Sequence, residues 1–231
     1  MTIAGYNKNS FVDYPGKIAA VVFTQGCNMN CWYCHNRHLI PMVAASTVDE
    51  DEIIKFLRKR KGMLDAVVIT GGEPTLQKGL ADFAARIKTE GFLVKLDTNG
   101  TRPQIIKELL VNKLLDFVAM DIKAPLEKYP LATCTGASIP ALKESIEVIK
   151  SSGIDYEFRT TFIPQLKKED ILKICREVAP CCAYALQQYR CTETEVAVAG
   201  IKAFPHAAEY IAETAEAARG IVGNNVIVRG L

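Results

Sequence analysis

Three cysteines lie within eight residues of one another near the amino end of the chain. Cys27, Cys31 and Cys34 form the pattern C-x3-C-x2-C in the segment CNMNCWYC. Three thiolates on one short loop can hold three irons of a four-iron, four-sulfur cluster, which leaves the fourth iron without a protein ligand. An open coordination position is typical of catalytic metal sites, because a substrate can bind there. The alternative is a zinc site completed by His35 or by a remote ligand, although His35 directly follows Cys34 and is badly placed to close a tetrahedron on one ion.

A second group of candidate residues follows the apolar run AVVIT. Gly71, Gly72, Glu73 and Pro74 come directly after Thr70 at the end of this run. Two glycines let the backbone come close to a ligand, and proline suits the first turn of a helix. Taken alone, the segment also fits an ordinary turn from a strand to a helix. Its position after a three-cysteine loop favours a binding site.

Charged and amide side chains follow two further apolar runs directly and lie within a third. Asp97 and Asn99 belong to the segment DTNG, Asp121 and Lys123 to the segment MDIK, and Arg159 to a run that starts at Tyr156. DTNG alone reads as a turn followed by a helix cap. Asp121 and Lys123 alternate along an otherwise apolar strand, so their charges should be paired or should face a ligand.

The elements that position these residues alternate along the chain. Short runs rich in β-branched and aromatic residues are typical of parallel strands covered on both faces. They are Ile18–Thr24, Ala66–Thr70, Phe92–Leu96, Phe117–Met120, Tyr156–Ile163 and Ala183–Gln187. Amphipathic stretches between them predict helices over Val48–Lys61, Gln77–Glu90, Arg102–Val111, Ile139–Ser152, Lys168–Val178 and His206–Arg219. Asn225–Arg229 is a candidate short terminal strand.

Repeated βα units predict an α/β fold with right-handed crossovers and a mostly parallel sheet. Six units fall short of a full eight-unit barrel. We therefore expect an open, partial (β/α)6 barrel of the TIM type, with a doubly wound sheet as the alternative. No break in composition divides the chain, so we expect a single domain over residues 1–231. In either fold the polar turns meet at the carboxyl ends of the strands.

Composition narrows the class of protein. The 28 basic and 26 acidic side chains of this 231-residue chain leave a formal charge of +2, which gives no general attraction to nucleic acid or to anionic lipid. The amino terminus lacks a signal-peptide pattern and no apolar run is long enough for a membrane span, so we expect a cytoplasmic protein. In that compartment clustered cysteines indicate metal or redox chemistry. The remaining five cysteines are Cys134, Cys175, Cys181, Cys182 and Cys191. We interpret them as apolar packing residues, although the adjacent pair Cys181-Cys182 could serve redox exchange.

The three-cysteine motif, with Tyr33 before its last cysteine, resembles the signature of the radical S-adenosylmethionine (radical SAM) superfamily. Gly71-Gly72-Glu73 resembles the GGE motif of that superfamily, and the resemblance extends over nearly the whole chain. Within the superfamily the chain is most similar to activating enzymes of glycyl radical enzymes. It looks most like the activating proteins of anaerobic ribonucleoside-triphosphate reductase, on the segments DYPGK, TQGCN and CHN. DTNG and DIK resemble segments of pyruvate formate-lyase activases.

The resemblance implies an oxidoreductase with a [4Fe-4S] cluster and S-adenosyl-L-methionine as cofactors. Such an enzyme reductively cleaves S-adenosylmethionine to a 5′-deoxyadenosyl radical and generates a glycyl radical on a partner enzyme, here anaerobic ribonucleotide reductase. Flavodoxin or ferredoxin is the implied electron donor, and Asp13–Lys17, with Tyr14, is the candidate docking edge for the partner. The alternatives are a radical SAM enzyme acting on a small molecule or nucleotide precursor and a non-catalytic metal-binding module.

The resemblance also implies roles for individual residues. Cys27, Cys31 and Cys34 would hold the cluster, while Gly71, Gly72 and Glu73 would orient the methionyl amine. Polar contacts to the ribose or carboxylate of the cofactor fall to Asn99, Lys123 and Arg159. Asp97 and Asp121 could instead hold a monovalent cation near that carboxylate. His35 would contact the cofactor or the partner, and Tyr33 would shield the adenine or the cluster.

Overall fold

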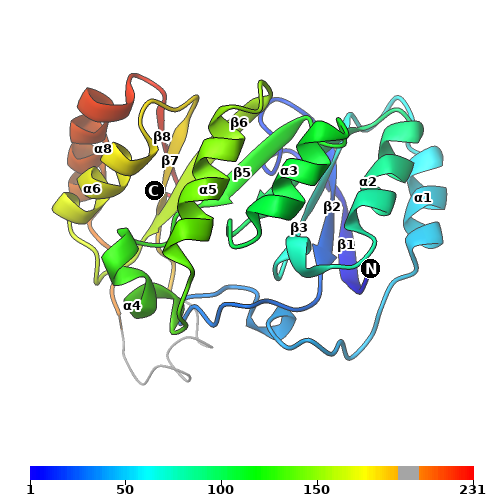
Figure 1. Ribbon diagram of the computed structural model, residues 1–231, viewed down its shortest axis with the longest axis horizontal. Helices are drawn as coiled ribbons and strands as arrows, with labels where there is room; N and C mark the ends of the chain where they lie inside the picture. Colours follow the sequence, from blue (N-terminus) through cyan, green and yellow to red (C-terminus); the bar gives the residue numbers. More distant parts are fainter. Residues whose placement is uncertain (192–202) are drawn as a thin grey trace.

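The computed structural model describes residues 1–191 and 203–231, and its core is one eight-stranded sheet (Figure 1). The strands lie side by side in chain order from β1 to β8. Their bounds are β1 Ile3–Ser10, β2 Ala19–Thr24, β3 Ala66–Gly71, β4 Leu93–Thr98, β5 Phe117–Asp121, β6 Asp155–Phe162, β7 Tyr184–Gln188 and β8 Val226–Arg229. Each predicted strand is confirmed to within two residues at either end.

Strand β1 is the one strand of this sheet that the sequence did not predict. It pairs antiparallel with β2, with Tyr6 opposite Val22, whereas all later neighbours pair in parallel. Only Ile3 is buried in β1, and its sequence IAGYNKNS contains no apolar run. An antiparallel edge strand can face water on one side, and this is why its pattern differs from that of the buried parallel strands.

Helices follow the parallel strands and cover one face of the sheet (Figure 1). The α-helices are α1 Glu50–Arg58, α2 Leu80–Thr89, α3 Pro103–Val111, α4 Tyr129–Thr133, α5 Ile139–Lys150, α6 Lys168–Val178 and α8 Ala208–Val222. Short 3-10 helices lie at η1 Arg37–Leu39, η2 Pro74–Leu76 and η3 Leu126–Lys128. The six predicted helices are confirmed, α6 with the predicted bounds, whereas the short turns η1, η3 and α4 carry too few apolar repeats to be predicted.

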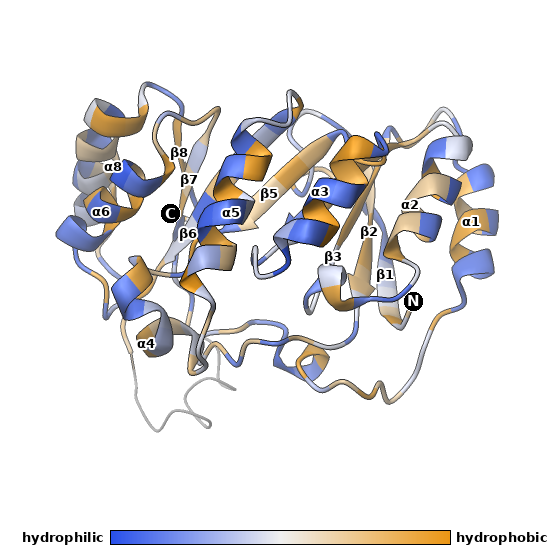
Figure 2. Ribbon diagram, in the orientation of Figure 1, coloured by the Kyte–Doolittle hydropathy of each residue, from blue (hydrophilic) through white to orange (hydrophobic). Residues whose placement is uncertain are grey.

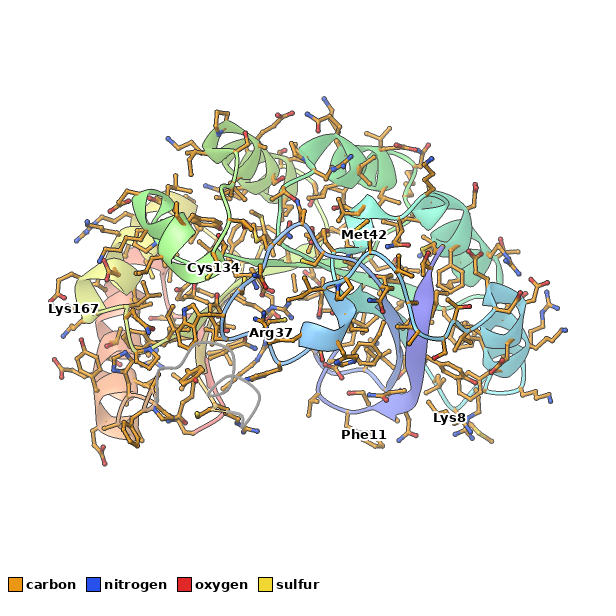
Figure 3. All side chains as sticks on the ribbon, turned by 90° about the horizontal axis from the view of Figure 1, so that it is seen from below. Lys8, Phe11, Arg37, Met42, Cys134 and Lys167 are labelled. Carbon is orange, nitrogen blue, oxygen red and sulfur yellow. The ribbon has the colours of Figure 1, made fainter. Side chains whose placement is uncertain are left out.

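The strand order distinguishes the two predicted architectures. In a doubly wound sheet the order reverses at a switch point, whereas here it runs from β1 to β8 without reversal. The sheet therefore curves as an open, partial barrel, as seen from below in Figure 3. The six predicted units correspond to β2–β7, and β8 with α8 adds a seventh parallel strand.

The two faces of the sheet differ in chemistry. Apolar side chains of the strands pack against the apolar faces of the helices (Figure 2). On the inner face, the amino-terminal ends of the strands carry a separate apolar cluster: Tyr14, Ala19, Val21, Ala66, Val68, Phe117 and Ala119. Charged and hydroxyl side chains replace this cluster toward the carboxyl ends. In the part of the chain that the structure describes, no helix is long and apolar enough to cross a bilayer.

Candidate active site

The segment with the three cysteines crosses the carboxyl ends of the strands (Figure 3). Its two ends are held together, because the Gly26 amide donates to the Leu39 carbonyl (2.7 Å). The Arg37 guanidinium donates to the Cys31 carbonyl and to Asn30 Oδ1, both at 2.9 Å. These bonds fix the residues 25–40, which we call the cysteine loop, above the inner face of the sheet.

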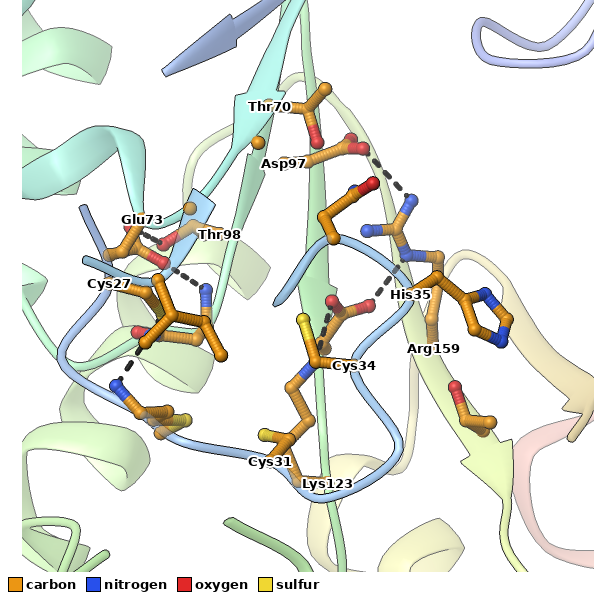
Figure 4. Close-up of a pocket in the computed structure, with 18 of the residues that line it drawn as sticks. Cys27, Cys31, Cys34, His35, Thr70, Glu73, Asp97, Thr98, Lys123 and Arg159 are labelled. Carbon is orange, nitrogen blue, oxygen red and sulfur yellow. Dashed lines mark hydrogen bonds and ion pairs between the residues drawn. The ribbon is translucent and has the colours of Figure 1, made fainter. Parts of the chain in front are cut away.

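A cavity of about 390 Å³ lies between the cysteine loop and the sheet (Figure 4). Every residue that the sequence predicted for the site lines this cavity. They are Cys27, Cys31, Tyr33, Cys34, His35, Gly71, Gly72, Glu73, Asp97, Asn99, Asp121, Lys123 and Arg159. Asp13, Asn36, Thr70, Thr98, Thr161 and Gln187 complete its polar lining. The turns that follow separate strands thus meet at this one cavity, where each side chain has its own partners.

The two glycines at the end of β3 are close to other backbone rather than to open space, Gly71 to the end of β2 and Gly72 to the start of the cysteine loop. A Cβ atom on Gly72 would lie 2.1 Å from the Gly26 carbonyl oxygen, and one on Gly71 would lie 2.5 Å from the Thr24 amide nitrogen. The Gly72 amide donates to the Thr24 carbonyl, and the Glu73 amide donates to the Gly26 carbonyl, both at 2.8 Å. The expected reason for these glycines, a ligand approaching the backbone, is therefore incomplete: they first let β3 dock on the start of the cysteine loop.

Glu73 joins the end of β3 to the end of β4. Its Oε1 accepts hydrogen bonds from the amide (3.1 Å) and hydroxyl (2.5 Å) of Thr75 and from the Thr98 hydroxyl (2.8 Å). Its Oε2 accepts one bond, from the Asn99 amide at 2.7 Å. Burial raises the pKa of Glu73, although these donors oppose the shift. Oε1 is thus committed to the fold, and Oε2 is the oxygen with room for a further donor.

Asn99 ties the end of β4 to the cysteine loop. Its side-chain amide donates to Asn28 Oδ1 (2.8 Å), and its Oδ1 accepts from the Thr101 amide and hydroxyl (3.1 and 2.7 Å). We call Gly71, Gly72, Glu73, Thr98 and Asn99 the neutral wall of the cavity, because hydrogen bonds from uncharged donors hold it together.

The opposite side of the cavity is built from alternating charges. Arg159 bridges two carboxylates: its Nε donates to Asp121 Oδ1 (2.8 Å) and its Nη1 to Asp97 Oδ2 (3.2 Å). Lys123 Nζ donates to Asp121 Oδ2 at 3.0 Å. Burial alone would raise the pKa of both aspartates, but the neighbouring cations outweigh it and hold each pKa below its usual range. We call Asp97, Asp121, Lys123 and Arg159 the charged wall.

The three thiols suit an iron–sulfur cluster. Cys27, Cys31 and Cys34 are free and line the same cavity. Burial raises the pKa of Cys27 to about 11 and also raises the pKa of Cys31, while the Lys123 ammonium partly opposes both shifts. Buried thiols of this kind are neutral until a metal replaces the proton. Among residues 1–191 and 203–231, no three His, Cys, Asp or Glu side chains are close enough to surround a single metal ion, so the tetrahedron of the zinc alternative is not preformed.

Tyr33 gives a second sign that the cavity accommodates a ligand. Its side chain is 5% exposed and borders the cavity, and its buried hydroxyl has no hydrogen-bond partner in the described part of the chain. A buried hydroxyl without a partner costs free energy, which a bound polar molecule can recover. His35 is held at the rim, where its Nε2 donates to the Arg190 carbonyl (3.1 Å).

The structure corrects the role predicted for Tyr14 in the docking edge Asp13–Lys17, whereas residues 15–17 of that segment are exposed. The Tyr14 side chain is only 6% exposed and belongs to the apolar cluster of the inner face, where its ring lies 5.5 Å from that of Phe117. Asp13 beside it lines the cavity. The exposed apolar residues of this turn are Phe11 and Val12, which precede the predicted segment and are 70% and 83% exposed. Tyr14 therefore serves the core and cannot present its ring to a partner.

Comparison with known proteins agrees with this site. Residues 21–178 match the family model of the radical SAM superfamily. A protein of Methanocaldococcus jannaschii, whose name assigns it provisionally as a glycyl-radical enzyme activating enzyme, is 42% identical over 195 residues, which is 81% of this chain and 79% of that protein. The pyruvate formate-lyase-activating enzyme of Clostridium pasteurianum is 31% identical over 170 residues, which is 71% of this chain and 70% of that enzyme.

Solved structures show the same fold at low sequence identity. Streptococcus suis SuiB, bound to its precursor peptide SuiA, superposes on 91% of this chain with a TM-score of 0.69 and 14% identity, and the chain spans about half of its length, 48%. Escherichia coli QueE matches 100% of this chain and 94% of its own, with a TM-score of 0.58 and 16% identity. The chain therefore belongs to the radical SAM superfamily and, within it, to the glycyl-radical enzyme activating enzymes.

Proposed function

We propose that this enzyme generates the glycyl radical of an anaerobic ribonucleoside-triphosphate reductase. The observation that carries the activase chemistry is one cavity in which three free thiols of the cysteine loop face the neutral and charged walls. The reductase as partner rests on the segments DYPGK, TQGCN and CHN of the sequence. A single radical SAM domain over residues 1–231 is part of the proposal.

The two walls suit the opposite charges of an amino-acid moiety. Glu73 Oε2 and the backbone carbonyls of the turn can accept from an ammonium group, and this acidic end lies in the neutral wall. Arg159 and Lys123 supply positive charge for a carboxylate on the other side. S-adenosylmethionine carries both groups on its methionyl end. The chain thereby orients that end of the cofactor, while Tyr33 and His35 border the cavity at the cysteine loop.

Cys27, Cys31 and Cys34 would hold three irons of a [4Fe-4S] cluster, with the fourth left for the cofactor. When bound, the reduced cluster supplies the electron that cleaves S-adenosylmethionine to methionine and a 5′-deoxyadenosyl radical, which takes a hydrogen atom from a glycine Cα of the partner. The work of the chain is to position the reactants and exclude water from the cavity. The electron comes from flavodoxin or ferredoxin, and a reducing cytoplasm keeps the three thiols available.

The open edge of the barrel gives the partner a way in. A second hollow shares His35, Thr161 and Gln187 with the central cavity and continues to Val12 and Arg229. We take this second hollow as the entrance to the cavity. A glycine-containing loop of a large partner can enter by it, whereas a sealed pocket would admit only small molecules.

The proposal is tested by anaerobic reconstitution with iron and sulfide, followed by reduction in the presence of S-adenosylmethionine and the candidate reductase. We expect 5′-deoxyadenosine and the doublet of a glycyl radical on the reductase in electron paramagnetic resonance. Cys31→Ala should abolish both signals. Cys134→Ala is the matched control, since Cys134 is exposed at the end of α4 and does not line the cavity.

The outcomes separate the competing functions. Cofactor cleavage without a radical on the reductase would refute this partner and favour a different glycyl radical enzyme or a small-molecule substrate. A protein that binds iron but makes no 5′-deoxyadenosine would be the metal-binding module. Equal loss in Cys31→Ala and Cys134→Ala would contradict the cluster assignment.

A further inference from the structure

One lysine inside the barrel has no part in the predicted site. Lys95 lies on β4, two residues before Asp97 and on the same face of the strand. It is 1% exposed. Its neighbours in the adjacent strands are Val68 and Phe117, both in the apolar cluster of the inner face, and its ammonium lies 5.8 Å from the centre of the Phe117 ring. A lysine buried at this depth requires an anionic partner.

That partner is a carboxylate oxygen of Asp97, in the charged wall. Lys95 Nζ donates to Asp97 Oδ1 at 2.5 Å. Arg159 takes Asp97 Oδ2 and Asp121 Oδ1, and Lys123 takes Asp121 Oδ2. All four carboxylate oxygens of the two aspartates are thus paired with cations that belong to the chain.

This count disagrees with the monovalent cation that the sequence led us to consider at Asp97 and Asp121. A metal cation of this kind binds through oxygen ligands. Here each of the four oxygens already accepts from an ammonium or a guanidinium group within 3.2 Å. Although each oxygen keeps a second lone pair, an added cation would stand beside three cationic groups, Lys95, Arg159 and Lys123, at a cost in like-charge repulsion.

We propose that Lys95 is a built-in replacement for such a cation. Its ammonium binds Asp97 Oδ1 and neutralises the carboxylate, which leaves Oδ2 directed toward Arg159. Three basic and two acidic groups, Lys95, Arg159 and Lys123 with Asp97 and Asp121, leave this row with one net positive charge. That charge suits the carboxylate of the cofactor without any metal ion. Lys95 is a positioning residue, since it acts through Asp97 and does not line the cavity.

The inference predicts how the protein responds to salts. The melting temperature of the full-length wild-type protein, with and without reconstituted cluster, should be equal in potassium chloride and in tetramethylammonium chloride at the same ionic strength. Its affinity for S-adenosylmethionine, measured by calorimetry, should also be equal in the two salts. Tetramethylammonium is too large to enter the row of charged side chains. A protein that depends on a small cation would therefore show a lower melting temperature and a lower affinity for S-adenosylmethionine in tetramethylammonium chloride.

Two variants create the dependence that the wild type lacks. Lys95→Ala leaves Asp97 Oδ1 without its cation and opens space for an ion, so the melting temperature of this variant should fall by roughly 6–12 °C in tetramethylammonium chloride. Potassium or ammonium chloride should restore much of that loss. Lys95→Met fills the same space with an uncharged chain, so its loss should persist in every salt. Lys88→Met is the matched control, because it breaks a Lys–Asp pair (2.7 Å) away from the cavity and should respond alike to all three salts.

The wild type alone can overturn the inference. Weaker S-adenosylmethionine binding or a lower melting temperature in tetramethylammonium chloride would show that a metal cation is still required. A Lys95→Ala protein that folds but gains nothing from potassium or ammonium would equally refute the replacement. The melting measurement needs no cofactor, so its failure is distinguishable from a failure of the proposed function, which rests on 5′-deoxyadenosine and the glycyl radical.

Discussion

The two walls of the cavity stabilise their carboxylates with different chemistry. Both hold carboxylates at the carboxyl ends of parallel strands, and these are fully buried at Glu73 and partly buried at Asp97 and Asp121. In the neutral wall Glu73 is surrounded by two hydroxyls and two backbone amides. In the charged wall Asp97 and Asp121 are surrounded by Lys95, Lys123 and Arg159.

The difference determines how each wall can fail. Neutral donors in the first wall come largely from the backbone of the turns, so its integrity depends on how closely those turns pack. The second wall depends on side chains alone, and removal of one charge leaves a partly buried opposite charge with one partner fewer. We therefore expect the neutral wall to be sensitive to shape and the charged wall to be sensitive to charge, salt and pH.

The largest effect should come from a shape change in the neutral wall. Gly72→Ala would place a methyl group 2.1 Å from the Gly26 carbonyl oxygen, and a backbone atom cannot yield as a side chain does. The end of β3 must then move away from the cysteine loop. A displacement of about 1 Å at a reacting centre costs roughly 100-fold in rate. We expect at least that loss in 5′-deoxyadenosine formation, measured with reconstituted protein.

Gly220→Ala provides the control for this prediction. Gly220 lies in α8, and an added Cβ would meet no atom within 4 Å. Alanine in a helix is favoured over glycine by up to about 1 kcal/mol, so this variant should be active and slightly more stable. An active Gly72→Ala protein would show that the close approach between β3 and the cysteine loop is dispensable.

The next largest effect should come from a charge change in the other wall. Arg159→Met removes the one group that bridges Asp97 and Asp121. Because two partly buried carboxylates lose a partner together and each keeps one lysine, we expect a loss of about 3 kcal/mol in the free energy of unfolding, measured in urea. Arg58→Met is the control. Its Arg58–Glu90 pair lies on the surface, with the arginine side chain 61% exposed, so solvent screens the pair and its loss should cost far less than the loss of Arg159. Equal losses in the two variants would contradict the charged wall.

A smaller effect should follow from Glu73→Gln. The amide keeps the shape of the carboxylate, but its nitrogen cannot accept, so at least one of the donors from Thr75, Thr98 or Asn99 loses its partner. An unsatisfied buried donor costs about 1–3 kcal/mol. The loss should be the same at low and high salt, because the donors are uncharged. A salt-dependent loss of stability is expected for Arg159→Met. If Glu73→Gln showed one as well, Glu73 would interact electrostatically with the charges across the cavity.

Much of the fold and of the site was predictable because its signals are local. Continuous apolar runs predicted β2–β8, and the two glycines before Glu73 marked the turn after β3. Strand β1 escaped because its burial depends on an antiparallel partner and on a face in water. The role predicted for Tyr14 was wrong because the sequence does not show that its turn packs against the inner face of the sheet.

The four residues of the charged wall were predicted for the site, but their ion pairs were predicted only in part, for a different reason. The alternation of Asp121 and Lys123 along a strand pointed to buried, paired charges. The same period of two joins Lys95 to Asp97 in the run FLVKLDT, and the sequence carries that signal too. What it cannot supply is the partner across the sheet. Asp97 and Arg159 are 62 residues apart and meet because β4, β5 and β6 are neighbours.

The smallest expected effect separates the walls by the sign of their response to acid. Asp97 and Asp121 have lowered pKa values, so the stability that they contribute is present above their ordinary pKa, near 4, and is lost as the pH falls below it. Glu73 has a raised pKa, so the folded chain holds its proton more tightly than the unfolded chain does. Its contribution is therefore present below an ordinary pKa near 4.5 and is lost as the pH rises through the raised value.

Free energies of unfolding between pH 3 and pH 7 test this difference. Asp97→Asn should flatten the fall in stability below about pH 4, while Glu73→Gln should flatten the opposing trend above about pH 4.5 and leave the acid fall in place. The exposed pair of Lys173 and Glu127 offers a control, since Glu127→Gln removes a carboxylate whose lowered pKa arises at the surface, where solvent screens the charge. If Asp97→Asn and Glu127→Gln changed the profile equally, the buried row of charges would carry no more weight than a surface ion pair, and the division of the cavity into two walls would lose its physical basis.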